Sequence, residues 1–139
     1  RFIGDVTGGV ERDIELALQS VTGPRFDVTL AGLGTFARRS RVHSVWAGVE
    51  QPDAVSALRD RIESALVRLG LEPEHRKFTP HVTLARMKKG GARAAGLYLE
   101  THAWFQAPPF TVEYFTLFES RLGHGGARYS VYRDYPLDA

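Results

Sequence analysis

The feature that most constrains the fold is an order of hydrophobic patterns that occurs twice along the chain. Residues 1–50 predict strand, helix, strand, loop and strand, and residues 81–137 predict the same order again. Each half also has a loop rich in glycine and arginine, at 32–41 and 121–128. We therefore predict an α+β protein of two lobes, in which each half forms a small antiparallel sheet flanked by helices.

The individual elements follow from the spacing of apolar residues. Helical spacing appears in residues 9–21 and, most clearly, in 55–69, where Gly70 is expected to end the helix. Alternation predicts paired strands at 26–30 and 42–50. The other predicted elements are strands at 1–6, 81–87, 110–121 and 129–137, and a weak helix at 92–105 that Gly96 interrupts.

Composition narrows the classes of protein. The 139 residues, 43% apolar and 24% charged, are typical of one globular domain. No apolar run is long enough to span a membrane, and no membrane partner is expected. The chain has no cysteine, which excludes a disulfide framework and thiolate metal ligands and fits a reducing cytoplasm. We expect a cytoplasmic monomer.

Basic residues gather in two stretches, although the formal net charge is only +2. The members are Arg38, Arg39 and Arg41 in the first, and Arg86, Lys88, Lys89 and Arg93 in the second. Such clusters favour an anionic partner, most often nucleic acid. The alternative is a pair of solvated loops that keep the protein soluble.

The segment TPHVTLAR contains the strongest chemical signal. On a strand, His81 and Thr83 project to one face about 6.5–7 Å apart, while Val82 and Leu84 point into the opposite layer. An imidazole can take or give a proton near neutral pH, and a threonine hydroxyl can donate to an anionic oxygen. In-line displacement at a phosphodiester needs both a base and an acid, so one histidine is half of the mechanism.

PHVTLAR, AGLGTF, RVHSVWAGVE and FTVEYFTLFESRLGHGGARY together resemble the two-histidine phosphoesterases. Among these they are similar to the RNA 2′,3′-cyclic phosphodiesterases, also called 2′-5′ RNA ligases. The resemblance covers residues 1–139. It implies one bilobal domain, with two pseudo-symmetric antiparallel sheets flanked by helices, an active-site groove between them, and two H-x-[ST]-x motifs. It further implies metal-independent hydrolysis of RNA 2′,3′-cyclic phosphate ends to 2′-phosphates, reversible 2′-5′ ligation, RNA ends as partners, and no cofactor.

The resemblance assigns roles to three residues. His81 matches the second catalytic histidine of the family, Thr83 its phosphate-holding partner, and Arg86 an arginine that contacts phosphate. On a flat strand Arg86 has the opposite parity to His81, so it reaches the site only if the strand bends or ends near Ala85. The first family motif would fall immediately before Arg1. We therefore expect the 1–139 domain to be N-terminally incomplete, and nearly inactive alone.

Two other functions remain open at this point. One is an RNA-binding module without catalysis, and the other is a phosphodiesterase for another small cyclic phosphate, such as ADP-ribose 1″,2″-cyclic phosphate. The chain has no H-E-x-x-H motif and no carboxylate at ligand spacing from His81, so the sequence predicts no metal site.

The remaining histidines and two aromatic residues can be explained without a role in catalysis or binding. His43 shares parity with Val45 and Ala47 and is expected to pack on its strand. We expect His75 to be solvated, His102 structural or exposed, and His124 in a hairpin turn that either borders the site or does not. Phe36 and Tyr129 either pack or stack on a base.

Overall fold

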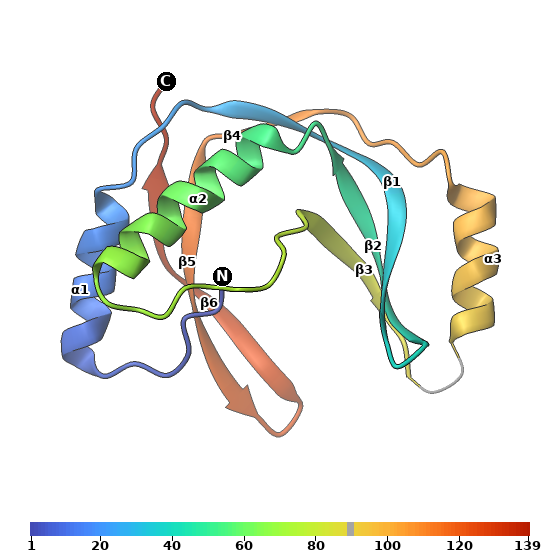
Figure 1. The fold of residues 1–139 in the computed structure, drawn as a ribbon, viewed down its shortest axis with the longest axis horizontal. Helices are drawn as coiled ribbons and strands as arrows, with labels where there is room; N and C mark the ends of the chain where they lie inside the picture. The colour runs from blue at the N-terminus through green and yellow to red at the C-terminus, as the bar shows by residue number, and fades with distance from the viewer. Residues whose placement is uncertain (89–90) are drawn as a thin grey trace. The chain divides into compact units, whose positions relative to one another are not determined.

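The computed structural model describes residues 1–88 and 91–139. The elements in chain order are α1 (Gly8–Gln19), β1 (Phe26–Arg38), β2 (Arg41–Glu50), α2 (Asp53–Arg68), β3 (His81–Arg86), α3 (Ala92–His102), β4 (Phe110–Val112), β5 (Tyr114–Gly123) and β6 (Gly126–Pro136) (Figure 1). One sheet has the order β3-β2-β1-β4, and the other pairs β5 with β6. The pairs β1–β2, β2–β3 and β5–β6 are antiparallel, which confirms the α+β class.

The chain divides into two compact units. Unit 1 contains residues 1–26, 57–76 and 111–139, and unit 2 contains residues 27–56 and 77–110. The prediction that 1–50 and 81–137 form separate lobes is therefore wrong. The reason is a long-range pairing: β3, from the second predicted half, is hydrogen-bonded to β2, from the first. The groove expected between the lobes stays a prediction.

In unit 1, the two amphipathic helices pack against the β5–β6 hairpin. Ile14 and Leu18 of α1 form a buried cluster with Leu66 of α2 and Tyr135 of β6. Burying a large aliphatic side chain contributes about 1.5–3 kcal/mol, so the helical spacing read from the sequence supplies much of this core. Gly70, at φ +100°, ends α2 as predicted, since the Leu71 N–H then donates to the Leu66 carbonyl.

Two strand predictions in unit 1 are wrong. Residues 1–7 form no strand. The single strand predicted at 110–121 divides at Glu113, because β4 belongs to the four-stranded sheet whereas β5 pairs with β6. The Glu113 carbonyl instead accepts a hydrogen bond from the Leu137 N–H at 2.8 Å.

In unit 2, β1 continues through the segment predicted as a loop at 32–41. The turn to β2 consists only of Arg39 and Ser40, whose φ values are +49° and +61°. Gly32, at φ +71°, lies at a register shift in the β1–β2 ladder. Gly34 lies opposite Trp46, where a Cβ would come within 2.2 Å of the indole ring. These glycines therefore mark a bulge and a close approach within a strand rather than a loop.

One face of the unit 2 sheet is buried. Val45 and Ala47 of β2 are buried, as is Ala95 of α3, and α3 packs against β2 (Figure 1). The register pairs these two β2 residues with Thr35 and Leu33 of β1, so they share one face of the sheet. The opposite face of this sheet carries Trp46, His81 and Thr83. None of the described helices is long and apolar enough to cross a membrane.

Candidate functional site

His81 and Thr83 lie on the outermost strand of the unit 2 sheet and share a face with Trp46. The register places His81 opposite Gly48 and Thr83 opposite Trp46, two residues apart on β2. Because side chains alternate along a strand, all four positions point to the face opposite Val45 and Ala47. The period-two spacing in TPHVTLAR thus brings the imidazole and the hydroxyl to one side of the sheet.

The backbone just before β3 orients the imidazole of His81. Its Nδ1 atom lies 2.6 Å from the carbonyl oxygen of Thr79, which can only accept a hydrogen bond. Nδ1 therefore carries a proton, and in the neutral ring the lone pair is on Nε2. His81 is exposed, so Nε2 is available to take a proton or, in the imidazolium form, to give one.

A bulge in β3 changes the direction of Arg86. Ala85 pairs with Val45 and Thr83 pairs with Trp46, so Leu84 is an extra residue with no partner on β2. Arg86 then lies opposite Ser44, two residues from Trp46 on β2 and therefore on the same face. The bend that Arg86 requires in order to join His81 and Thr83 is supplied by this bulge.

Aromatic rings surround His81 on this face. The His81 ring centroid lies 4.9 Å from that of Phe36, edge-on, and 5.8 Å from that of Trp46. Phe36 and Trp46 are themselves 5.2 Å apart. The indole lies over Gly34 and beside Gly48, and its buried Nε1–H has no partner among the described residues. Phe36 and Trp46 therefore form an aromatic surface next to the exposed imidazole of His81, which we call the aromatic floor.

The prediction that His43 packs on its strand is wrong. A register shift leaves His43 as an extra residue on β2, between Ser44 opposite Phe36 and Val42 opposite Ala37. The bulge breaks the parity with Val45, so His43 is exposed and its ring stacks 6.4 Å from that of Phe36. His43 lies beside Phe36, and Trp46 beside His81. The sequence singled out neither of them as a site candidate, because long-range strand pairing brings them to this face.

The opposite face of β3 also differs from expectation. Val82 and Leu84 are each 46% exposed, rather than buried in a second layer. Every residue of β3 is exposed, because the strand is the outermost one in its sheet.

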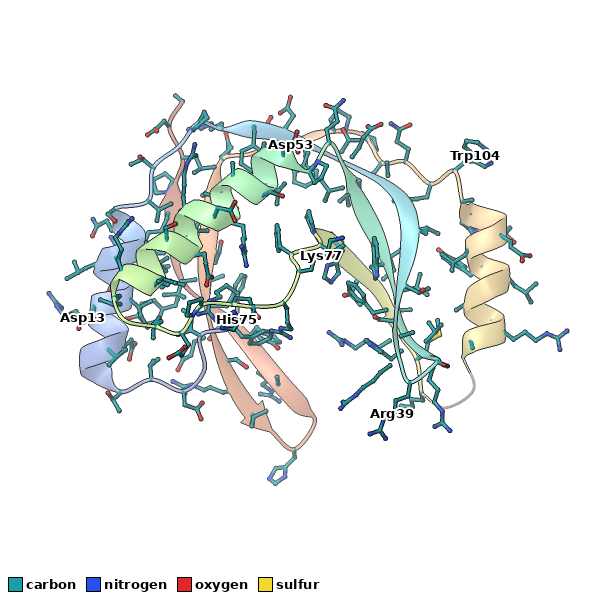
Figure 2. All side chains as sticks on the ribbon, in the orientation of Figure 1. Asp13, Arg39, Asp53, His75, Lys77 and Trp104 are labelled. Carbon is teal, nitrogen blue, oxygen red and sulfur yellow. The ribbon has the colours of Figure 1, made fainter. Side chains whose placement is uncertain are left out.

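The remaining histidines belong to other elements of the chain. His75 is exposed in the loop after α2, as predicted (Figure 2). His102 ends α3, is exposed, and stacks on Tyr98 with ring centroids 4.2 Å apart. His124 lies in the β5–β6 turn, which confirms the hairpin. Tyr129 is exposed on β6.

Positive charge gathers at one end of the unit 2 sheet. Figure 2 shows nitrogen-bearing side chains around Arg39, at the tip of the β1–β2 hairpin. Beside the tip is an open hollow of about 520 Å³, whose lining includes Arg41, His43 and Lys88. Lys89, predicted as part of the same basic cluster, lies outside the described residues. Within the described ranges, no group of three His, Asp or Glu side chains is arranged to hold a metal ion.

Comparisons with known proteins show which family the chain resembles. The model of the 2′-5′ RNA ligase superfamily matches residues 6–124. An Aeropyrum pernix protein named RNA 2′,3′-cyclic phosphodiesterase is 44% identical over 94 residues, which are 67% of this chain and 52% of the relative. An Escherichia coli protein of the same name is 30% identical over 137 residues, 98% of this chain and 72% of the relative. The chain thus spans about half the length of the Aeropyrum relative.

Solved structures show the same fold. The crystal structure of Escherichia coli LigT complexed with 3′-AMP has a TM-score of 0.78 and 25% identity, and covers 100% of this chain and 75% of that one. A crystal structure described as a phosphoesterase has a TM-score of 0.74 and 26% identity, over 99% of this chain and 74% of that one. With the family match over residues 6–124, these likenesses show that the chain belongs to the 2′-5′ RNA ligase superfamily.

Proposed function

We propose that this chain belongs to an enzyme that hydrolyses RNA 2′,3′-cyclic phosphate ends to 2′-phosphates, with His81 as one of two acid–base groups. The observation that carries the proposal is the bulge at Leu84, because it brings the Arg86 position to the face of His81 and Thr83. A proton-transfer group, a hydroxyl donor and a guanidinium on one face suit a phosphate. The names of the relatives from Aeropyrum and Escherichia support the same reaction.

The reaction requires two proton transfers. Water attacks phosphorus and loses a proton, the bond from phosphorus to O3′ breaks, and O3′ takes up a proton. The Nε2 atom of His81 serves either transfer, because the Thr79 carbonyl holds the proton of the ring on Nδ1. Two imidazoles in opposite protonation states supply both transfers, so no step of the proposed reaction involves a metal ion.

The second histidine follows from the resemblance described above. It belongs to the first of the two H-x-[ST]-x motifs that the resemblance implies. In the reverse direction the same two groups exchange roles, which is how we account for 2′-5′ ligation. Thr83 and Arg86 are proposed to bind the non-bridging phosphate oxygens, which carry most of the charge in the transition state. The expectations of a monomer in the cytoplasm stay predictions.

The test is to identify the product. A short RNA ending in a 2′,3′-cyclic phosphate is incubated with the complete translation product that contains residues 1–139, and the ends are compared by chromatography with authentic 2′- and 3′-phosphates. We expect 2′-phosphate alone. A protein that retains the RNA on a filter but leaves the cyclic phosphate intact is a binding module, and formation of a 3′-phosphate would contradict the assigned chemistry.

A further inference from the structure

The arginines of unit 2 are organised differently from those of unit 1. Residues 27–56 and 77–110 contain eight lysines and arginines against four carboxylates, whereas the remaining residues contain ten against twelve. Six ion pairs join residues within unit 1; they are Arg1–Glu63, Arg25–Glu113, Arg59–Asp60, Arg76–Glu74, Arg121–Glu119 and Arg133–Glu15. Unit 2 therefore has the excess of positive charge.

Within the described residues, the cations at the hairpin end of unit 2 have no side-chain partner. They are Arg38, Arg39, Arg41, Arg86 and Lys88, all of them exposed. An exposed guanidinium without a carboxylate is available to an anion from outside the protein. We call Arg38, Arg39, Arg41 and Lys88 the basic tip.

The basic tip is held in an electrostatically unfavourable arrangement. Arg38 and Arg41 are directly opposite each other in the ladder, where like charges destabilise a hairpin. Arg39 and Ser40, between them, both have positive φ, as the two central residues of a two-residue hairpin turn require. A bound polyanion would relieve the charge repulsion between Arg38 and Arg41.

The basic tip is continuous with the proposed catalytic face. Arg86 at the end of β3 lies opposite Ser44, and the Met87 N–H donates to the carbonyl oxygen of His43 at 2.8 Å. Lys88 follows directly and lines the hollow with Arg41 and His43. From His81 to Arg86 the strand rises roughly 15 Å, more than a single nucleotide end needs.

We propose that the basic tip is an accessory subsite for the phosphates of RNA nucleotides next to the cyclic phosphate end, so that the preferred substrate is an oligonucleotide. This inference rests on the proposed function, because RNA reaches the tip along the face of His81. RNA fits better than an acidic protein or a lipid surface, since the exposed His43 ring and the half-buried Phe36 ring lie between His81 and the tip, where bases can stack.

The test measures binding without catalysis. A fluorescently labelled 12-nucleotide RNA with a 2′-phosphate end is titrated with the complete protein by anisotropy at several salt concentrations. In the triple variant Arg38→Gln, Arg39→Gln, Arg41→Gln, we expect the dissociation constant to rise at least tenfold. The slope of log K against log salt should fall by about 2, since each lost contact to a single strand contributes roughly 0.7.

Two further variants keep this result interpretable. The variant Arg12→Gln, Arg68→Gln, Arg128→Gln removes the same charge from exposed positions of unit 1 that take part in none of its six ion pairs. It should bind RNA within twofold of wild type. The triple Arg→Lys variant of the tip retains point charges and should retain most of the salt slope.

Three outcomes overturn the proposal. One is RNA binding within twofold in the tip variant, and another is an equal loss in both glutamine triples. The third is a tip variant that binds RNA normally but no longer binds polyglutamate or phosphatidylserine vesicles. A wild-type protein that binds RNA through the tip but opens no cyclic phosphate overturns only the proposed function.

Discussion

The two units use the same residue type for different purposes. In unit 1, Arg76 donates from Nε and from a terminal nitrogen to the two carboxylate oxygens of Glu74, and Arg133 pairs with Glu15 across the hairpin and α1. In unit 2, Arg86 stands beside Thr83 on a sheet face and has no such partner among the described residues. A guanidinium that already has a carboxylate contributes a modest local stabilisation, whereas one without is ready for a phosphate. Net charge, at +2, conceals this division.

Removal of the imidazole from unit 2 should have the largest effect. His81→Ala deletes one of the two proposed proton-transfer groups, and turnover of cyclic phosphate RNA should fall by about 10² or more. His75→Ala, at an exposed loop position of unit 1, should change turnover by less than about twofold. Steady-state rates of the two purified variants give the comparison. Equal losses would mean that the two units do not differ in the proposed way.

Removal of the Arg86 guanidinium should have the second largest effect on the reaction. A charge-assisted hydrogen bond to phosphate contributes about 1.5–3 kcal/mol, so Arg86→Gln should lower kcat/KM by roughly 10- to 100-fold. Arg76→Gln removes a paired arginine and should leave kcat/KM within about twofold. Initial rates at subsaturating RNA measure both. An unchanged kcat/KM in the Arg86 variant would remove this residue from the site.

A methyl group added at glycine distinguishes the packing of the two units. In Gly34→Ala, the new Cβ would lie 2.2 Å from the rigid Trp46 ring, and we expect a loss of about 1–3 kcal/mol in the free energy of unfolding. In Gly23→Ala, the nearest atom is the terminal nitrogen of Arg61 at 2.0 Å, which can swing away. The expected change there is within about 0.5 kcal/mol. Urea denaturation with unchanged m-values measures both, and similar losses at the two positions would contradict the rigid aromatic floor.

The smallest effect concerns pH and belongs to unit 1. The hydrogen bonds from Arg76 lower the pKa of Glu74 from 4.5 to about 2. A carboxyl with a lowered folded-state pKa adds stability above its ordinary pKa and loses it as the pH falls toward 2. Glu74→Gln should therefore reduce the drop in Tm between pH 5 and pH 2.5, and Arg76→Gln should do the same. If both variants follow the wild-type pH curve, the pair does not contribute in this way.

The sequence predicts a feature correctly where the spacing of neighbouring residues along the chain determines that feature. Helical spacing placed Ile14 and Leu18 in the core of unit 1, and Gly70 at the end of α2, because both depend on neighbours along the chain. Alternation likewise brought His81 and Thr83 to one face. Alternation predicts the wrong face of the sheet only next to the two bulges, at His43 and at Leu84. At each of them one extra residue shifts the following side chains to the other face.

Long-range pairing accounts for the other errors. Nothing near residue 113 shows that its two flanking strands enter different sheets, and nothing near residue 81 shows that β3 joins β2. The glycines at 32 and 34 read as loop residues until their partners are known. Gly34 is explained only by the Trp46 ring that the register places opposite it.

The most direct test of the difference between the units is amide hydrogen exchange in the presence of a 12-nucleotide RNA ending in a 2′-phosphate. Exchange reports locally which backbone segments a ligand protects. We predict slower exchange in His81–Arg86 and at the tip of the β1–β2 hairpin when the RNA binds. Slower exchange confined to unit 1, with β3 and the hairpin tip unchanged, would contradict the assignment of the RNA site to unit 2.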